Sequence, residues 1–385
     1  MTVALGIENL IKHLPKELRH QKLGLVCHPA SVCFGYQHSR FAIDKAFPRQ
    51  LTTLFAPQHG FWGAKQDNMI ESDDMTDFLL NIPAYSLYGR VRKPTPPMLQ
   101  NIDVLLIDLQ DVGTRVYTFI WTMAYCMQAC AEQRKKVIVL DRPNPIGGQM
   151  IEGNILDMNY KSFVGLYPIP MRHGMTMGEL AKYLNAVYDI GCDLDVVPMT
   201  GWKRDMFWNN TQLPWVAPSP NMPTTQTVLV YPGQVLFEGT NISEARGTAM
   251  PFEQFGAPFV DSAIFQDMAP EGAVLRPVSF EPTSGKWTGK TCGGLFIHVT
   301  NAQKFQPYAM TLELLQRLIK HYPQDFQWKQ PPYEYEFDKM PIDIILGSGT
   351  IRKDLEAGVP VLEMQKAWQA DIARFKKETK PYLLY

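Results

Sequence analysis

The densest group of reactive side chains lies in Ile107-Asp-Leu-Gln-Asp-Val-Gly-Thr-Arg-Val-Tyr117. It follows Val104-Leu-Leu-Ile107, a short apolar run that predicts a buried parallel strand, and it precedes an apolar helical segment. Asp108, Asp111 and Arg115 therefore lie where a strand ends and a crossover helix begins. Open α/β sheets bind ligands at that edge. A fold requires no charges there, so the pattern predicts a functional site.

Three other predicted strands also end in polar residues set among Gly and Pro. These strand ends are His28-Pro-Ala-Ser31, Ala56-Pro-Gln-His-Gly-Phe-Trp-Gly63 and Asp141-Arg-Pro-Asn-Pro-Ile-Gly-Gly148. Gly and Pro form sharp turns, and Gly lets the backbone approach a ligand closely. We therefore expect the four edges to converge on one cleft.

The order of elements that positions these edges alternates between strands and helices. We expect strands at 23–27, 51–55, 104–107, 136–140 and 193–197, with helices near 40–47, 116–132 and 176–188. This alternation predicts an α/β fold with a Rossmann-like, doubly wound parallel sheet over residues 1–240. Strands at 275–280 and 294–299 and helices at 311–321 and 361–377 predict a smaller α/β domain over residues 241–385, which closes the cleft.

The chain between residues 202 and 258 is rich in Pro, Asn, Thr and aromatic residues, and long irregular segments of this kind are usually functional. Within it, two carboxylates, an amide and a guanidinium crowd together between glycines: Glu238, Asn241, Glu244 and Arg246. Arg172 and His173 precede a predicted helix, whose N-terminal N–H groups favour anions. These residues are further candidates for substrate binding.

Composition narrows the function classes. The chain has 385 residues, 45% hydrophobic and 19% charged, and a net charge of −1 without a basic block, so nucleic-acid binding is not expected. The longest apolar stretch, 116–130, is interrupted by polar residues and is too short to span a membrane. The N-terminus shows no signal-peptide pattern, and six scattered cysteines favour a reducing compartment, so we expect a cytoplasmic protein.

Carboxylates, amides and aromatic side chains such as Tyr117 in one cleft suit a carbohydrate ligand. Glycosidic cleavage usually uses two acidic groups, one to protonate the leaving oxygen and one as base or nucleophile. A metal-dependent hydrolase using His28, His59, Asp108 and Asp111 is an alternative. No Gly-x-Gly-x-x-Gly or Walker loop follows any of the strands, so no nucleotide cofactor is expected.

Over essentially its whole length the chain resembles the exo-β-N-acetylmuramidase family of peptidoglycan hexosaminidases. The resemblance is carried by Ser86-Leu-Tyr-Gly89, Lys93-Pro-Thr-Pro96, Asp108-Leu-Gln-Asp-Val-Gly-Thr-Arg115, Leu140-Asp-Arg-Pro-Asn-Pro145, Val164-Gly-Leu-Tyr-Pro-Ile-Pro170, His173-Gly-Met-Thr176, Pro218-Ser-Pro-Asn-Met-Pro223 and Glu238-Gly-Thr-Asn-Ile-Ser-Glu244. It implies a Rossmann-like domain, a smaller C-terminal domain, an active site between them, and removal of N-acetylmuramic acid from non-reducing ends. No cofactor is implied.

One position departs from the family. Where relatives commonly read Pro-Glu-His-Gly, with that Glu the proposed catalytic acid, this chain has Pro57-Gln-His-Gly60. An amide cannot donate a proton as an acid. We expect Glu71, or alternatively Asp67, to supply the missing carboxyl group, with Asp111 as the second catalytic carboxylate. A sugar-binding protein that has lost catalysis is the rival interpretation, and retaining, inverting and substrate-assisted mechanisms all remain open.

The predicted site therefore has two groups of residues. The catalytic candidates are Glu71, Asp111, Gln58 and His59. The substrate-binding candidates are Arg115, Tyr117, Arg142, Asn144, Arg172, His173, Asn221, Glu238, Asn241, Glu244 and Arg246. Of these, the guanidinium groups of Arg115, Arg172 and Arg246 are suited to the lactyl carboxylate of muramic acid, because guanidinium binds carboxylate in a bidentate manner.

Overall fold

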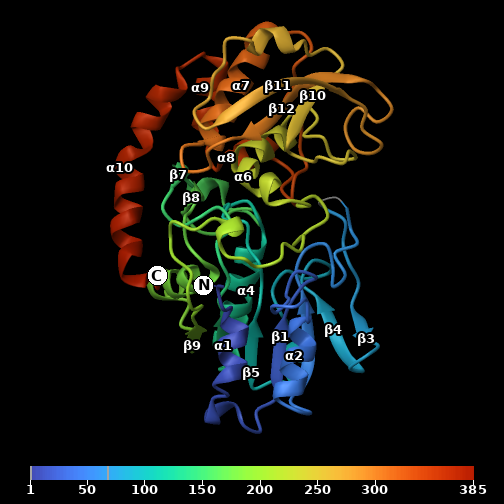
Figure 1. Ribbon diagram of the computed structural model, residues 1–385, viewed down its shortest axis with the longest axis vertical. Coiled ribbons are helices and arrows are strands. Elements are labelled where there is room, and N and C mark those ends of the chain that lie inside the picture. The colour runs from blue at the N-terminus through green and yellow to red at the C-terminus, as the bar shows by residue number, and fades with distance from the viewer. Residues whose placement is uncertain (1, 67–68) are drawn as a thin grey trace.

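Seven strands form the main sheet of the protein, which a computed structural model describes over residues 2–66 and 69–385 (Figure 1). Their order across the sheet is β3-β4-β2-β1-β5-β6-β9, and all neighbours are parallel except the antiparallel edge pair β3 and β4. The strands are β1 (Leu23–Val26), β2 (Leu51–Ala56), β3 (Met75–Asp77), β4 (Ile82–Ser86), β5 (Val104–Ile107), β6 (Lys136–Leu140) and β9 (Leu194–Val197).

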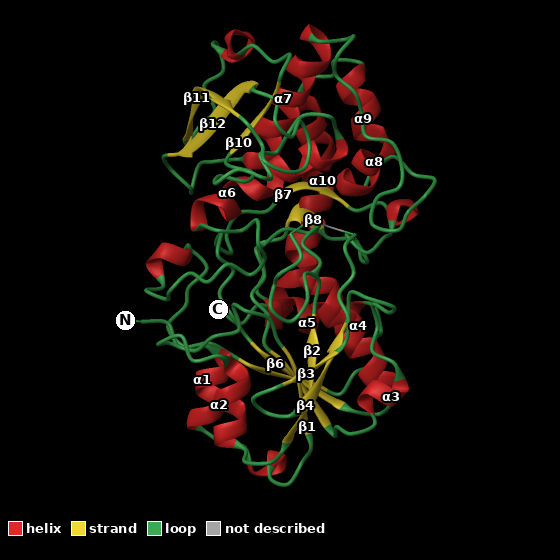
Figure 2. Ribbon diagram, turned by 90° about the vertical axis from the view of Figure 1, so that its right-hand side faces the viewer, coloured by secondary structure: helices red, strands yellow, loops and turns green. Residues whose placement is uncertain are grey.

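Both faces of this sheet are buried, which explains why its central strands are continuously apolar. Successive side chains of a strand point to opposite faces, so Leu25 of β1 joins one hydrophobic cluster and Val26 joins the other. Helices α1 (Gly6–Lys12) and α2 (Ser39–Ala46) cover one face, and α3 (Pro96–Leu99) and α4 (Phe119–Glu132) lie on the other (Figure 2). The predicted doubly wound α/β architecture is confirmed.

The sequence located strands β1, β2, β5, β6 and β9 and helices α2 and α4. Helices α1 and α3 were not predicted, and the structure differs in two further respects. Helix α4 begins at Phe119 rather than at residue 116, because Thr114–Thr118 forms a turn that leads into the helix. Strands β3 and β4 were not predicted. Their segment is short and polar, and Pro83 lies within β4, so it lacks the apolar run that identifies a central strand.

The second domain is built on a three-stranded antiparallel sheet in the order β10-β12-β11. Its strands are β10 (Gln254–Ala257), β11 (Ala273–Phe280) and β12 (Cys292–Val299). Its helices are α6 (Thr225–Gln234), α7 (Pro307–His321), α8 (Pro341–Leu346) and α9 (Gly349–Glu356), with the 3₁₀-helix η4 (Val235–Gly239) after α6. The predicted smaller α/β domain is confirmed. The division near residue 240 remains our proposal, although α6 and η4, which precede that residue, pack against α7 and α8 of the second domain.

Several segments tie the two domains together. The hairpin of β7 (Glu152–Ile155) and β8 (Pro170–Arg172) lies between them, and α5 (Met177–Val187) follows it with the predicted Thr176 capping box. Helix α10 (Val361–Thr379) runs back along the molecule, so the C-terminus returns to the first domain (Figure 1). There the Tyr385 hydroxyl donates to Asp141 Oδ2 over 2.8 Å. None of the helices in the described ranges is long and apolar enough to cross a membrane.

Candidate active site

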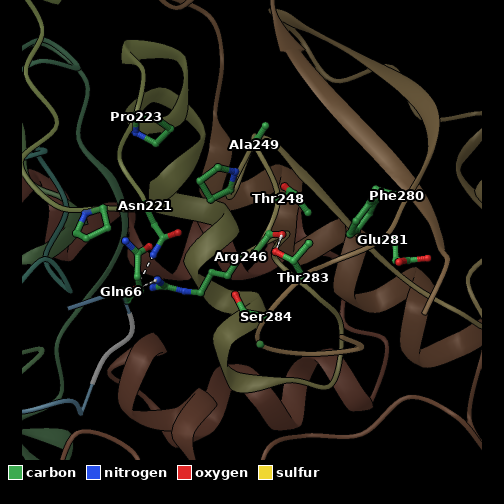
Figure 3. Close-up of a pocket in the computed structure, with 14 residues that line it drawn as sticks. Gln66, Asn221, Pro223, Arg246, Thr248, Ala249, Phe280, Glu281, Thr283 and Ser284 are labelled. Carbon is green, nitrogen blue, oxygen red and sulfur yellow. Dashed lines mark hydrogen bonds between the residues drawn. The ribbon is translucent and has the colours of Figure 1, made fainter. Parts of the chain in front are cut away.

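Two adjoining cavities lie between the strand ends of the main sheet and the second domain. The larger is an open cleft of about 810 Å³, within the range typical of ligand pockets. The smaller is a recess of about 40 Å³, with room for the edge of a ring or one substituent. Asn221 and Arg246 line both cavities, and both donate hydrogen bonds to the carbonyl of Gln66 (Figure 3). The recess is therefore an extension of the cleft.

Both domains supply the walls of the recess. Gln58 and His59 follow the end of β2, and Tyr117 belongs to the turn between β5 and α4. The second domain supplies Glu238 from η4 and Glu334 from the loop before α8. The structure thus brings two of the predicted strand ends together with the irregular segment that follows residue 202.

Gln58 lies in a buried hydrogen-bond network around Glu334. The Thr118 hydroxyl donates to Gln58 Oε1 over 2.7 Å, which leaves the amide nitrogen of Gln58 facing Glu334 Oε1 at 3.4 Å. The Tyr88 hydroxyl donates to Glu334 Oε2 over 2.7 Å and itself accepts from the Met69 N–H over 2.9 Å. Glu334 is therefore held against Gln58, the residue that stands where the family's sequence motif has a glutamate.

The environment of Glu334 favours its protonated form. Burial raises the pKa of Glu334 to about 7; the Tyr88 hydrogen bond opposes this rise, and the nearby Glu238 carboxylate adds to it. Glu334 is buried, with only 4% of its surface exposed to solvent. A carboxyl group with such a pKa can hold a proton near neutral pH and release it during a reaction.

Glu238 has the opposite kind of environment. It accepts hydrogen bonds from Arg246 Nη2 over 2.6 Å and from the Tyr333 hydroxyl over 2.8 Å. Arg246 Nε also lies 3.3 Å from Glu244, whose other oxygen pairs with Lys286 at 2.7 Å. Although burial opposes it, Lys286 and Arg246 lower the pKa of Glu244. One recess therefore holds Glu238, a carboxylate paired with Arg246, beside Glu334, whose carboxyl group accepts from Tyr88 and Gln58.

Three residues that line the recess have strained backbone conformations. His59, Phe252 and Glu334 all line the recess and have φ angles of +73°, +62° and +46°. Left-handed conformations of non-glycine residues cost about 1–3 kcal/mol each and are kept where the surrounding structure imposes them, often at functional sites.

Asp111 and His173 form a buried pair behind the recess wall. Asp111 Oδ2 accepts from the Gly113 N–H over 2.7 Å and lies 3.2 Å from His173 Nε2. Because His173 Nδ1 accepts from the Met175 N–H, the Nε2 atom carries the proton and faces Asp111. Neither residue is among the described residues that line the two cavities, whereas their neighbour Tyr117 is. The predicted catalytic role of Asp111 and the substrate-binding role of His173 stay predictions.

Arg115 and Arg172 lie deep in the protein instead of in the cavities. Arg115 is fully buried and donates to four backbone carbonyls, those of Asn154, Ile169, Ile345 and Leu346, which hold α8 against the first domain. Arg172 is buried beside Glu152 and donates to the carbonyl of Ile146. These contacts give both guanidinium groups a structural role, in contrast to the expected contact with a substrate carboxylate.

Two further substrate-binding candidates have structural contacts. Arg142 forms a buried bidentate ion pair with Asp108, at 2.6 and 2.9 Å. Asn144 bridges the N–H of Ile146 and the carbonyl of Met175 within the strand-end turn. Asn241 lines a separate surface cavity with Trp287 and Trp328. The cleft and recess therefore contain part of the predicted site, but not Arg142, Asn144 or Asn241.

Glu71, the expected replacement acid, is exposed and accepts a hydrogen bond from the Tyr335 hydroxyl over 3.2 Å. It is not among the described residues that line the two cavities. Its catalytic role stays a prediction, and Asp67, the alternative, lies outside the described residues.

Two of the residues proposed as metal ligands, His28 and Asp108, form hydrogen bonds and an ion pair with other protein groups. His28 Nε2 accepts from the Gln110 N–H over 2.9 Å, its Nδ1 lies 3.3 Å from the Pro218 carbonyl, and Asp108 pairs with Arg142. Across residues 2–66 and 69–385, no group of three or more His, Cys, Asp or Glu side chains is arranged to hold a metal ion.

Sequence analysis missed the residues that complete the recess from the C-terminal side: Tyr333 and Glu334. They lie in Pro331-Pro-Tyr-Glu-Tyr335, a segment whose Pro-rich, aromatic and acidic composition resembles the strand-end turns, and that signal was available. Tyr88 was also missed, although it lies in Ser86-Leu-Tyr-Gly89, one of the motifs that carry the family resemblance.

Comparisons with known proteins agree with this architecture. Residues 23–226 match the model of the N-terminal domain of exo-β-N-acetylmuramidase NamZ, and residues 229–385 match that of its C-terminal domain. The chain is 43% identical to peptidoglycan β-N-acetylmuramidase NamZ of Bacillus subtilis over 387 residues, covering 100% of this chain and 91% of that protein.

Two crystal structures of DUF1343 family proteins from Bacteroides fragilis have the same fold. One superposes with a TM-score of 0.88 at 32% identity, and the other with 0.76 at 29% identity; each covers 100% of this chain and 99% of its own. From these matches, which span both domains, the chain belongs to the exo-β-N-acetylmuramidase NamZ family.

Proposed function

We propose that this protein is a glycoside hydrolase that releases terminal N-acetylmuramic acid from the non-reducing end of peptidoglycan fragments. One observation carries the proposal: the open cleft ends in a recess of about 40 Å³ that contains Glu238 and Glu334. We infer that a saccharide bound along the cleft ends at this narrow recess, which suits an exo-acting enzyme. The activity named for the Bacillus subtilis relative supports the same reaction.

The recess also contains the groups that glycosidic cleavage needs. Two carboxyl groups with different environments can divide the work of acid catalysis and of stabilising positive charge on the sugar ring. Their surroundings are mostly buried, so little water screens the charges that develop during the reaction.

Arg246 is the best placed partner for the lactyl carboxylate. Of the three arginines expected to bind it, Arg246 lines both cavities, whereas Arg115 and Arg172 are engaged with backbone carbonyls. Its guanidinium is partly exposed, at 16% of the side chain, and faces Glu238 and Glu244. A substrate carboxylate would add a third acidic group to this cluster, which a guanidinium with five N–H donors can accommodate.

Replacing Arg246 tests this proposal. We expect Arg246→Ala to weaken binding of a β-N-acetylmuramide by about 1.5–3 kcal/mol, the scale of a hydrogen bond to a charged group. The corresponding β-N-acetylglucosaminide lacks the lactyl carboxylate, so its weaker turnover should change less. The measurement is kcat/KM for both aryl glycosides.

Arg276→Ala is the matched control, because Arg276 is an exposed arginine on β11 away from both cavities. An equal loss for the two glycosides in Arg246→Ala would show that Arg246 only supports the local structure. Absence of turnover of the N-acetylmuramide by the unmodified protein would contradict the proposed function.

A sugar-binding protein without catalysis is the second candidate, and Gln58 is the observation that favours it. In that case calorimetry should detect binding of a muramic-acid disaccharide without its cleavage, and Gln58→Glu should create activity. Measurable cleavage by the unmodified chain excludes this candidate.

We also propose that the protein acts in the cytoplasm on fragments recovered from the cell wall. All six cysteines are free and buried, including Cys126 and Cys130 on one face of α4. Thiols remain unpaired in this way in reducing compartments. Fractionation of the producing cell checks the location, and enrichment outside the cytoplasm would contradict it.

A further inference from the structure

We propose that Glu334 is the general acid of this enzyme and that Gln58, at the position of the family's catalytic glutamate, serves to orient it. The inference rests on the proposed glycosidase function and identifies the residue that replaces the missing acid. It rests first on position, because both side chains line the same recess and the Gln58 amide faces Glu334 Oε1.

The hydrogen-bond geometry fixes the orientation of the Glu334 carboxyl group. The Tyr88 hydroxyl accepts from the Met69 N–H, so its own proton points to Glu334 Oε2 at 2.7 Å. This strong contact occupies Oε2 as an acceptor. The acid proton therefore belongs on Oε1, whose contact with the Gln58 amide is longer, at 3.4 Å. In this arrangement the proton can turn towards a sugar at the mouth of the recess.

Gln58 is itself held in one orientation. Its Oε1 accepts from the Thr118 hydroxyl over 2.7 Å, so its amide N–H groups are directed to Glu334. A glutamate at position 58 would place a second carboxylate against Glu334 and Glu238. The amide avoids that repulsion and supplies a donor that stabilises Glu334 after the proton has left.

Glu334 transfers its proton to the glycosidic oxygen while the bond from that oxygen to the anomeric carbon breaks, and the bonding electrons stay on the leaving oxygen. Glu334 becomes a carboxylate that accepts from Tyr88 and Gln58. Water then supplies a hydroxyl group to the anomeric carbon, and the proton that this water releases restores the acid form of Glu334.

The groups around Glu334 set the pH range of this step. Tyr88 and Gln58 donate to it, and the other charged or titratable groups among the described residues that face it or line the recess are Arg92, His59, Tyr117, Tyr231, Glu238, Arg246 and Tyr333. Burial raises the pKa of Glu334 to about 7. We therefore expect kcat/KM for a natural disaccharide to fall on the alkaline side with a midpoint near pH 7.

Leaving-group dependence tests the proposal. Protonation matters for a sugar leaving group and hardly matters for 4-nitrophenolate, which departs without a proton. Glu334→Gln should therefore lose about 10²–10⁴-fold in kcat on a β-linked muramic-acid disaccharide. It should retain most of its rate on the 4-nitrophenyl glycoside, and the alkaline fall in its pH profile should disappear.

The control is Asp338→Asn, which removes an exposed carboxyl group from the same loop and should leave both rates unchanged. Equal losses on the two substrates in Glu334→Gln, or no loss on the disaccharide, would overturn the assignment. A selective loss in Glu71→Gln instead would assign the acid to Glu71. If the unmodified protein cleaves neither substrate, the proposed function falls together with this inference.

Discussion

Glu334 imposes a stability cost that can be measured independently of activity. Its pKa is raised by burial from an ordinary value of 4.5 to about 7, so the native state retains a proton that the unfolded chain has lost between these pH values. Native stability therefore falls as pH rises through this window, and the full cost is present above pH 7.

Glu334→Gln removes this titration and should stabilise the protein at pH 8 relative to the unmodified chain. Because one pKa unit corresponds to about 1.4 kcal/mol, we expect a gain of about 1–3 kcal/mol at pH 8 that is much smaller at pH 4.5. Urea denaturation at the two pH values measures it. An equal difference at both would show that Glu334 titrates alike in folded and unfolded chains.

At this scale, sequence reasoning found the side chains that follow strands and missed those supplied by a distant loop. Gln58, His59 and Tyr117 were placed correctly at strand ends, because the edge of a parallel sheet is predictable from the pattern of strands. The approach of Glu334 depends on tertiary packing across 276 residues, which local pattern does not encode. The replacement acid was therefore sought nearby, at Glu71.

Among the elements, the ends of β5 and β6 are joined by the buried ion pair of Asp108 and Arg142. The sequence predicts that Asp108 and Arg142 belong to a functional site. In the structure they neutralise each other's charge without a ligand. Removing one member of such a pair leaves an uncompensated charge in the interior, which typically costs about 3–5 kcal/mol.

Arg142→Ala should accordingly lower the free energy of unfolding by about 3–5 kcal/mol. Adding Asp108→Asn to the same chain should recover part of the loss, because the unpaired charge is gone. Chemical denaturation of the single and double variants measures both effects. Unaltered stability together with weaker substrate binding in Arg142→Ala would instead support the substrate-binding role expected from sequence.

Helices and strands were largely predictable from the sequence where the spacing of apolar residues clearly favours one of the two. The apolar runs of β1, β5 and β6 and the Thr176 capping box of α5 all identified their elements within a few residues. The edge strand β3 and its neighbour β4 were missed because both are short and neither contains a continuous apolar run. The end of the turn before α4 was misplaced for a related reason, since Val116 and Tyr117 are as apolar as the helix that follows.

At the scale of the whole molecule, both domains build the site, and α10 with the C-terminal residues links the second domain back to the first. Arg115 adds a second link, since its guanidinium joins the carbonyls of Asn154 in β7 and of Ile169, just before β8, to two carbonyls of α8. The two-domain fold was predictable from the change in element pattern along the chain. A cleft closed by the second domain was also expected from the polar strand ends. The residues that make the contact were not predicted, because partners such as Gln58 and Glu334 lie far apart in the sequence.

If the cleft ends at the recess, the enzyme removes one terminal sugar at a time. Mass spectrometry of the products formed from two purified peptidoglycan saccharides of equal length tests this. One carries N-acetylmuramic acid at the non-reducing end and the other carries N-acetylglucosamine there. We predict release of a single N-acetylmuramic acid from the first and much slower release of a terminal sugar from the second. Internal cleavage of either saccharide would show that the cleft accepts a continuous chain.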